Sequence, residues 1–187
     1  MSSQVLHKTD QQIEEEKLQI ELAKQDPKQF ETLYNKYFQQ IFIFINRRTD
    51  NLDLSGDITS QVFLKAMLNL NKYQFKGVPF SAWLYRIALS EINQHYRENQ
   101  KNRAISLEET DLKNIIEEAE ENFSEEKTSA LINAFQQLEE DQLQLIELRF
   151  FEKRSFKEIG EIMEITENNA KVKVYRVIDK LKNIMKS

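Results

Sequence analysis

The chain has 187 residues, with 26 Lys and Arg against 31 Asp and Glu, so its formal net charge is −5 at pH 7. It contains no cysteine, which excludes disulfides, thiolate metal sites and a Cys nucleophile and suits a reducing compartment. Only 3 Gly and 2 Pro stand among many good helix formers, so we predict an all-α protein. The N-terminus has no apolar run, and the longest one, residues 41–45, is too short to span a bilayer. We therefore expect a cytoplasmic protein without a signal peptide or direct membrane insertion.

The charges are distributed unevenly along the chain. Residues 27–104 carry a net charge of +5, residues 105–128 carry −7, and residues 166–187 hold 6 basic and 2 acidic side chains. A uniformly acidic protein would repel nucleic acid, but here two basic segments flank an acidic one. Nucleic acid therefore remains a candidate partner of both basic segments.

The first part of the chain predicts two helices separated by a short turn. The first covers residues 11–25, and its inward candidates are Ile13, Leu18, Leu22 and Ile20. Pro27 then occupies a first-turn position, where its missing N–H costs nothing. Apolar residues recur with helical spacing from there to Ile45.

A polar break over residues 47–57 precedes a third helix, which Asp57 is expected to cap. The apolar stripe of this helix is expected to be Ile58, Val62, Phe63, Ala66, Met67 and Leu70. A loop over residues 73–80 follows, and a fourth helix begins near Ser81. Rings and cations are concentrated here, but the helical spacing of Trp83 and Leu84 is more typical of core residues than of a contact surface.

From about residue 99 to residue 127 the apolar period is lost, and this acidic stretch predicts a flexible, partly helical linker. Four further helices are expected at residues 129–138, 140–151, 155–163 and 167–185. The last two are joined by a short turn, as in a helix-turn-helix domain. Their inner faces are expected to hold Phe156, Ile159, Gly160, Ile162, Met163, Val172, Val174, Val177, Ile178 and Leu181.

The sequence offers little for catalysis. Its two histidines, His7 and His95, are far apart in the chain, and no glycine-rich phosphate loop or metalloprotease motif is present. The acidic cluster at residues 117–121 fits a solvated charge run better than a metal site, because it lacks the spacing of a calcium loop. We therefore predict a protein that is not an enzyme and that has no metal, cofactor or small-molecule substrate.

The last two helices have the features of a DNA reader. Gly160 allows a close helix crossing, Ile165 fills the turn, and Thr166 can cap the second helix. A solvated amphipathic helix is the alternative, but cap, turn and basic face coincide at one spacing. The polar and basic side chains expected to face DNA are Asn168, Asn169, Lys171, Lys173, Tyr175 and Arg176.

The segment "QLEEDQLQLIELRFFEKRSFKEIGEIMEITENNAKVKVYRVIDKL" resembles region 4 of extracytoplasmic-function sigma factors, the small two-domain class of the sigma-70 family. This resemblance implies that the second helix lies in the major groove of the −35 promoter element. Two residues depart from the family pattern, since Glu139 replaces a Pro and Glu164 replaces a turn Gly. If the turn needs a positive φ, either Glu164 adopts it at some cost or the turn differs.

The first half of the chain resembles region 2 of the same family. "DPKQFETLYNKYF" is similar to its opening motif, "GDITSQVFLKAM" to the helix that binds the polymerase β′ clamp, and "FKGVPFSAWLYRIA" to the promoter-melting segment. A solvated face would be the simpler interpretation of the second motif alone. Ser60 and Gln61 replace a Gln and an acidic residue of the family there. The outward residues that the resemblance assigns to core polymerase are Asp57, Ser60, Gln61, Leu64, Lys65 and Leu68.

The melting segment combines rings with cations, which suits unpaired DNA. Rings stack on exposed bases and cations follow the phosphates. The resemblance implies that the loop captures a base of the −10 element, with Ser90 standing where the family often has Asn. The residues expected at the single strand are Lys72, Tyr73, Phe75, Lys76 and Ser90. Those expected at duplex phosphates are Arg86, Arg97, Lys101 and Arg103.

These patterns predict two helical domains on a tether. The expected boundaries are an N-terminal extension at 1–25, region 2 at 26–103, an acidic linker at 104–128 and region 4 at 129–187. The resemblance implies core RNA polymerase (β′ clamp and β subunit), promoter DNA and an anti-sigma factor as partners. An ordinary helix-turn-helix regulator with an N-terminal sensing or dimerisation domain is the alternative. A nuclease is not favoured because no carboxylate or His constellation supports it.

Overall fold

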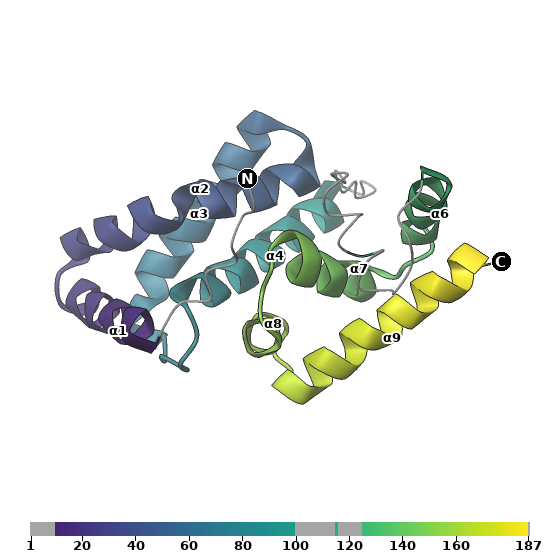
Figure 1. Cartoon of the computed structure of the whole chain (residues 1–187). Helices are drawn as coiled ribbons and strands as arrows, with labels where there is room; N and C mark the ends of the chain where they lie inside the picture. The colour runs from purple at the N-terminus through teal and green to yellow at the C-terminus, as the bar shows by residue number, and fades with distance from the viewer. Residues whose placement is uncertain (1–9, 100–114, 116–124, 187) are drawn as a thin grey trace. The chain divides into compact units, whose positions relative to one another are not determined.

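The computed structural model describes residues 10–99, 115 and 125–186 (Figure 1). The elements in these residues are all helical, which confirms the all-α prediction, and none of these helices has the length and apolarity needed to cross a membrane. The chain divides into two compact units between Ser106 and Leu107, inside the predicted linker. Of the predicted linker, residues 104–114 and 116–124 lie outside the described residues, and Ile115 is buried. The predicted phosphate contacts Lys101 and Arg103 also lie outside the described residues.

The first unit contains four α-helices and two short 3-10 turns in its described part. The order is α1 (Asp10–Gln25), η1 (Pro27–Gln29), α2 (Phe30–Thr49), α3 (Leu52–Asn69), η2 (Leu70–Lys72) and α4 (Phe80–Asn99). The predicted start at Pro27 is confirmed, because Pro27 opens η1 and the Asp26 carboxylate accepts the N–H of Lys28 at 3.0 Å. Helices α2, α3 and α4 pack on one another, and α1 packs on α2 and η2.

The core between α2, α3 and α4 is apolar and rich in rings. Phe44 and Tyr85 meet edge to face with centroids 4.8 Å apart, and Gln40 donates a hydrogen bond of 2.9 Å to the Tyr85 hydroxyl. Such a partner is what a buried phenol needs. The buried residues of α3 include Ile58, Val62, Phe63 and Ala66, as predicted. Long-range packing of these stripes therefore holds the first unit together.

Helix α3 begins six residues earlier than predicted, so the expected cap at Asp57 is wrong. Asp50 ends α2 in the left-handed conformation (φ 47°), and Asn51 caps α3 by accepting the N–H of Leu54 at 2.9 Å. Asn and Asp tolerate these conformations because their short side chains bond the nearby backbone. Asp57 consequently lies inside α3 with an exposed side chain.

Three apolar residues of the first unit that were predicted to face inward are exposed instead. Leu18 and Leu22 of α1 are 64% and 46% exposed, and Met67 of α3 is 40% exposed. The buried face of α1 is formed by Glu16, Ile20 and Ala23, and Ile13 is half-buried. Apolar periodicity does not predict the burial of a carboxylate such as Glu16, because hydrogen bonds and not apolar contacts compensate for its burial.

The second unit contains α6 (Glu125–Phe135), α7 (Glu140–Ile146), the π-helix η3 (Glu147–Phe151), α8 (Phe156–Met163) and α9 (Glu167–Lys186). The side chain of Ser155 accepts the N–H of Glu158 at 3.2 Å, and the Glu158 carboxylate accepts the N–H of Ser155 at 2.9 Å. This reciprocal pair is a capping box, and it sets the start of the first helix of the helix-turn-helix.

At the turn between α8 and α9, Glu164 adopts the positive φ, which was one of the two alternatives. Its backbone is left-handed (φ 57°), and its N–H donates to the carbonyl of Gly160. A Cβ on Gly160 would lie 2.8 Å from the carbonyl oxygen of Ile165, so glycine is needed for the close approach of the turn rather than for a helix crossing. The predicted cap is also confirmed, since the Thr166 hydroxyl accepts the N–H of Asn169 at 3.2 Å.

Candidate nucleic-acid interface

One face of α9 is polar and exposed along the first half of the helix. Its opposite face is buried through Ala170, Val174, Val177, Ile178 and Leu181. The expectation that Val172 is buried is wrong, because that side chain is 37% exposed. Two residues from Ala170 is about 200° around a helix, so Val172 lies away from the buried stripe. The exposed residues comprise all six predicted for DNA: Asn168, Asn169, Lys171, Lys173, Tyr175 and Arg176.

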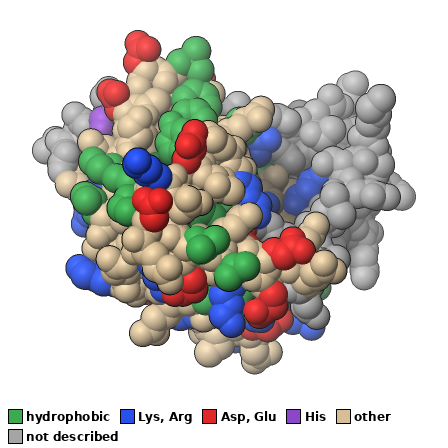
Figure 2. All heavy atoms as spheres, turned by 90° about the vertical axis from the view of Figure 1, so that its left-hand side faces the viewer, with side chains coloured by type: hydrophobic (Ala, Val, Ile, Leu, Met, Phe, Trp, Pro, Cys, Tyr) green, Lys and Arg blue, Asp and Glu red, His purple; other side chains and the backbone are tan. Residues whose placement is uncertain are grey.

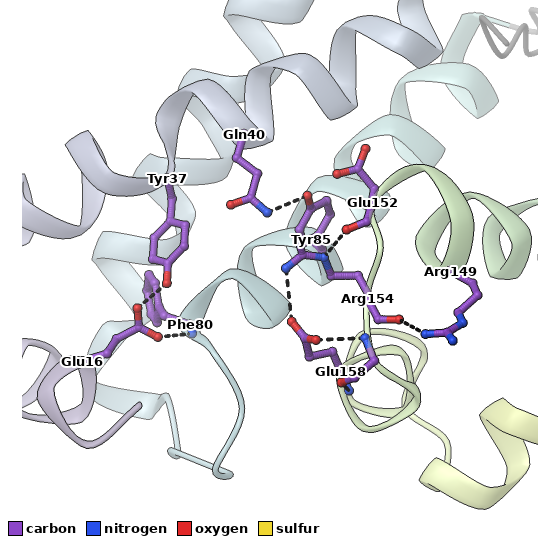
Figure 3. A network of polar contacts seen from close by, with 10 residues as sticks. Glu16, Tyr37, Gln40, Phe80, Tyr85, Arg149, Glu152, Arg154 and Glu158 are labelled. Carbon is purple, nitrogen blue, oxygen red and sulfur yellow. Dashed lines mark hydrogen bonds and ion pairs between the residues drawn. The ribbon is translucent and has the colours of Figure 1, made fainter. Parts of the chain in front are cut away.

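A polar network that the sequence did not predict supports the start of α8 (Figure 3). Arg154 donates to the carbonyl of Glu152 at 2.7 Å and to the Glu158 carboxylate at 3.1 Å. Arg149 donates to the carbonyl of Arg154 at 3.2 Å, and its guanidinium lies 4.5 Å from the Phe156 ring centroid. These contacts hold the chain that enters the helix-turn-helix. Of these contacts, only the pair of Arg154 with Glu158 has the i, i+4 spacing that a sequence can suggest.

The loop between η2 and α4 places its two predicted rings differently. Phe75 is half-buried, and Lys72 and Lys76 are exposed. Tyr73 is only 9% exposed, with its ring centroid 4.8 Å from that of Trp83 and 5.3 Å from that of Phe80. The expectation that the Tyr73 ring projects from the loop is therefore corrected, because it fills a gap in the aromatic core beside α4.

Helix α4 carries the remaining described candidates on one face. Arg86, Ser90 and Arg97 are spaced at i, i+4 and i+11, which places them within about 40° of one another around the helix. Ser90 and Arg97 are exposed and Arg86 is half-buried. The opposite side holds the core, where Leu84 is buried as predicted. Trp83 lies about 20° from Ser90 around the helix, on the same side as this stripe, and is half-buried. The geometry thus leaves a short, basic, polar stripe on α4.

The predicted polymerase face of α3 is present and is largely exposed. Leu68 is 68% exposed, and Asp57, Ser60, Gln61 and Leu64 are also exposed. Lys65 is half-buried and forms an ion pair of 2.6 Å with Glu91 of α4. Exposed leucines among polar groups are typical of a surface that docks on another helix.

An apolar groove that the sequence did not predict adjoins this face. It has a volume of about 560 Å³ and lies between the start of α2 and the middle of α3. Figure 2 views the molecule from the left-hand side of Figure 1, and it shows apolar side chains exposed between charged ones. The exposed Met67 lines this groove, so its unexpected exposure widens the apolar part of the α3 surface. The residues that line it are Pro27, Lys28, Phe30, Glu31, Tyr34, Ser60, Phe63, Leu64 and Met67.

Comparison with known families accounts for both units. The model of sigma-70 region 2 matches residues 33–102, and the model of sigma-70 region 4 matches residues 128–181. The ECF RNA polymerase sigma factor BldN of Streptomyces coelicolor is 27% identical over 158 residues, which are 83% of this chain and 60% of that relative. RNA polymerase sigma factor SigZ of Bacillus subtilis is 27% identical over 156 residues, 83% of this chain and 86% of the relative.

Solved structures share the fold. The sigma factor RpoE of Bartonella quintana, solved in complex with the anti-sigma factor NepR, aligns with a TM-score of 0.54 at 18% identity and covers 85% of this chain and 98% of its own. CnrH, solved with the cytosolic domain of CnrY, aligns with a TM-score of 0.57 at 15% identity and covers 91% and 97%. The chain belongs to the sigma-70 family of RNA polymerase sigma factors, in its extracytoplasmic-function class.

The two family matches also show which part of the chain is not accounted for. The region 2 match begins at residue 33, so the whole of α1 precedes it. The candidate residues of α3, α4, α9 and the loop all fall inside the two matches. The alternative of a helix-turn-helix regulator with an unrelated N-terminal domain is not favoured, because the N-terminal half is itself sigma region 2.

Proposed function

We propose that the chain directs bacterial core RNA polymerase to its promoters through three separate surfaces and acts without catalysis of its own. The exposed face of α3 binds core polymerase, α9 reads the −35 element, and the loop before α4 receives an unpaired base of the −10 element. The observation that carries this proposal is the exposed apolar face of α3, with Leu64 and Leu68, in the unit that also holds the ring-and-cation loop. A regulator that only binds duplex DNA needs neither feature.

Docking on polymerase is supported by the composition of the α3 face. Leu64, Leu68 and the neighbouring Met67 are apolar and exposed, and burying them against a partner helix removes apolar surface from water. The adjoining groove gives a partner side chain a place to enter. Asp57 and Gln61 supply polar contacts at the edge of the same face, which orient a partner more than they stabilise it.

Recognition of the −35 element is supported by the start of α9. Asn and Arg side chains can bond base edges in the major groove, and Lys side chains can neutralise phosphates. Asn168 and Asn169 lie in the first turn, where a recognition helix contacts bases, and Lys171 and Lys173 follow on the exposed side. The exposed methyl groups of Val172 add a contact suited to a thymine methyl.

Promoter opening is supported by the energetics of the loop. Extracting a base from the duplex costs a few kcal/mol, and stacking a ring on that base returns roughly 1–3 kcal/mol. Phe75 is the accessible ring, while Lys72 and Lys76 place positive charge beside it. Ser90 and the two arginines of α4 continue this polar surface along the helix.

An anti-sigma factor belongs among the proposed partners. RpoE of Bartonella quintana was solved in complex with an anti-sigma factor, and we extend that partner class to this chain. A protein that covers the apolar α3 face would compete directly with core polymerase. The proposed place of action is the cytoplasm, where core polymerase and the promoters are found.

Reconstitution with core polymerase tests the proposal. The chain should co-purify with bacterial core polymerase, and the complex should retain specific promoter fragments from a genomic library, which sequencing identifies. It should then transcribe both the duplex form and a pre-melted form of those promoters. Tight binding to duplex DNA by the chain alone, with no binding to core polymerase, would overturn the proposal in favour of an ordinary regulator.

A further inference from the structure

Helix α1 contacts the proposed promoter-opening loop at three points. The Glu16 carboxylate accepts the backbone N–H of Phe80 at 2.6 Å, where α4 begins. Lys24 donates to the carbonyl of Tyr73 at 3.1 Å, where the loop starts. Between them, the Lys17 ammonium lies 5.5 Å from the ring centroid of Phe75. Both ends of the loop and its accessible ring are therefore held by a helix that precedes the family match.

Glu16 is the strongest of these contacts because it is fully buried. Its side chain is 0% exposed, and Figure 3 shows it between Tyr37 and Phe80. One carboxylate oxygen accepts the Tyr37 hydroxyl and lies 2.9 Å from the Lys36 ammonium, while the other accepts the Phe80 N–H. A buried carboxylate is tolerated only when such partners compensate for its lost hydration.

The contact with Phe80 also solves a local problem at the start of α4. Helices usually begin after a Ser, Thr, Asp or Asn whose side chain accepts a free N–H of the first turn. Pro79 stands before α4 and has no side-chain acceptor. Glu16, 64 residues earlier in the chain, supplies the acceptor, and its negative charge is favourable at the positive end of the helix.

We propose that α1 positions the promoter-opening loop and that Glu16 is its main positioning residue. This inference rests on the proposed function, in which Phe75 receives an unpaired base. Fixing the loop before DNA arrives lowers the conformational entropy lost on capture, so a held loop opens the promoter more readily than a free one. Glu16 acts through the loop backbone and does not touch DNA itself.

The substitution Glu16→Gln tests this role in the reconstituted holoenzyme. An amide keeps the size of the side chain but has only one oxygen, so it can no longer serve Lys36 with Tyr37 and Phe80 together. The matched control is Glu15→Gln, on the exposed side of α1, which removes the same charge. The measurement is the rate of open-complex formation on a duplex promoter that carries 2-aminopurine in the −10 element, together with affinity for core polymerase.

The positioning role has a defined outcome. Glu16→Gln should slow opening of the duplex promoter about tenfold, the loss expected when a charged, buried hydrogen bond is broken. Binding to core polymerase and opening by the Glu15→Gln control should stay within about twofold of the unmodified chain. Equal loss of opening and of polymerase binding would overturn the proposal, because it would show that Glu16 only maintains the fold. Unchanged opening by Glu16→Gln would overturn it as well.

A double-mutant cycle separates positioning from a general effect. If Glu16 acts by placing Phe75, the combination of Glu16→Gln with Phe75→Ala should open the promoter as slowly as Phe75→Ala alone. If the double variant instead slows opening by the product of the two single effects, the proposal is contradicted. If Phe75→Ala slows opening and Glu16→Gln does not, only the positioning role of Glu16 is refuted. If Phe75→Ala opens the promoter normally, the proposed function of the loop is refuted as well.

Two variants outside the core, at the half-buried Lys24 and the exposed Lys17, keep the test decisive if Glu16→Gln does not fold. Lys24→Gln removes the bond to the Tyr73 carbonyl, and Lys17→Gln removes the cation near Phe75, while neither lies in the core. Each should slow opening of the duplex promoter several-fold while thermal unfolding of the chain is unchanged. If both open the promoter at the normal rate, α1 does not position the loop.

Discussion

The two proposed DNA-reading elements are built in opposite ways. In α9 the reading side chains lie on a regular helix, whose other face is buried through Ala170, Val174 and Leu181. In the first unit the reading ring, Phe75, lies on a loop whose two ends are tied to α1 by Glu16 and Lys24. A helix presents its side chains by its own geometry, whereas a loop needs other elements to hold it. Substitutions near the loop should therefore have effects that depend on distant residues, and substitutions on α9 should not.

The largest effect is expected from Tyr73→Ala, which breaks the support of the loop. Tyr73 is buried against Phe80 and Trp83, and truncating such a ring costs roughly 3–5 kcal/mol of the free energy of unfolding. Chemical denaturation of the chain measures this loss. Polymerase binding and promoter opening should fall together, and loss of opening at full stability would instead mean that the Tyr73 ring contacts DNA.

Phe75→Ala should slow promoter opening while leaving the stability of the fold nearly unchanged. Phe75 is half-buried, so its removal should change thermal unfolding little, but a lost stack of roughly 1–3 kcal/mol should slow promoter opening by about five- to 150-fold. The fluorescence of 2-aminopurine in the −10 element measures this rate. A pre-melted promoter is the control, because the cost of extracting the base is already paid there. If the duplex and the pre-melted promoter respond alike, Phe75 is not needed for opening.

On α9, Lys171→Ala combined with Arg176→Ala should weaken binding to the −35 element without affecting the fold. Both side chains are exposed, and each lost phosphate or base contact should cost about 1 kcal/mol or more. If both cations neutralise phosphates, the logarithmic dependence of affinity on salt should become less steep by about two. Holoenzyme affinity measured over a salt series checks both effects. Unchanged occupancy of the promoter would contradict the placement of α9 in the groove.

The smallest effect is expected at the turn of the helix-turn-helix. Glu164 adopts a left-handed conformation that costs a non-glycine residue about 1–2 kcal/mol. Glu164→Gly should therefore stabilise the second unit by about 0.5–1 kcal/mol, after the entropy of the added glycine is subtracted. Thermal unfolding measures the gain, and −35 affinity should not change because the turn already has this shape. Weaker −35 binding by a stabilised variant would show that the Glu164 side chain itself contacts DNA.

The helical interpretation succeeded best where a residue depends on its neighbours in the chain. Most side chains expected on the outward faces of α3 and α9 are exposed, and the cap expected from the residue type of Thr166 is present. The helical interpretation failed where the local sequence allowed two caps or two packed faces equally well. Asp57 and Asn51 are both good caps, and the left-handed backbone at Asp50 selected Asn51. Leu18 and Leu22 form an apolar pair with helical spacing, yet the opposite face of α1 is the one that packs.

What the sequence by itself determined is the class of the protein and the location of its surfaces along the chain. Composition specified helices, and two motif sets in order specified regions 2 and 4 of a sigma factor. Only the tertiary structure decided the burial of Glu16 and Tyr73, the exposure of Met67 and the groove beside it. The physical reason is distance along the chain. Helical periodicity relates residues three or four positions apart, whereas the Glu16 carboxylate and the Phe80 N–H meet across 64 positions and only in the folded protein.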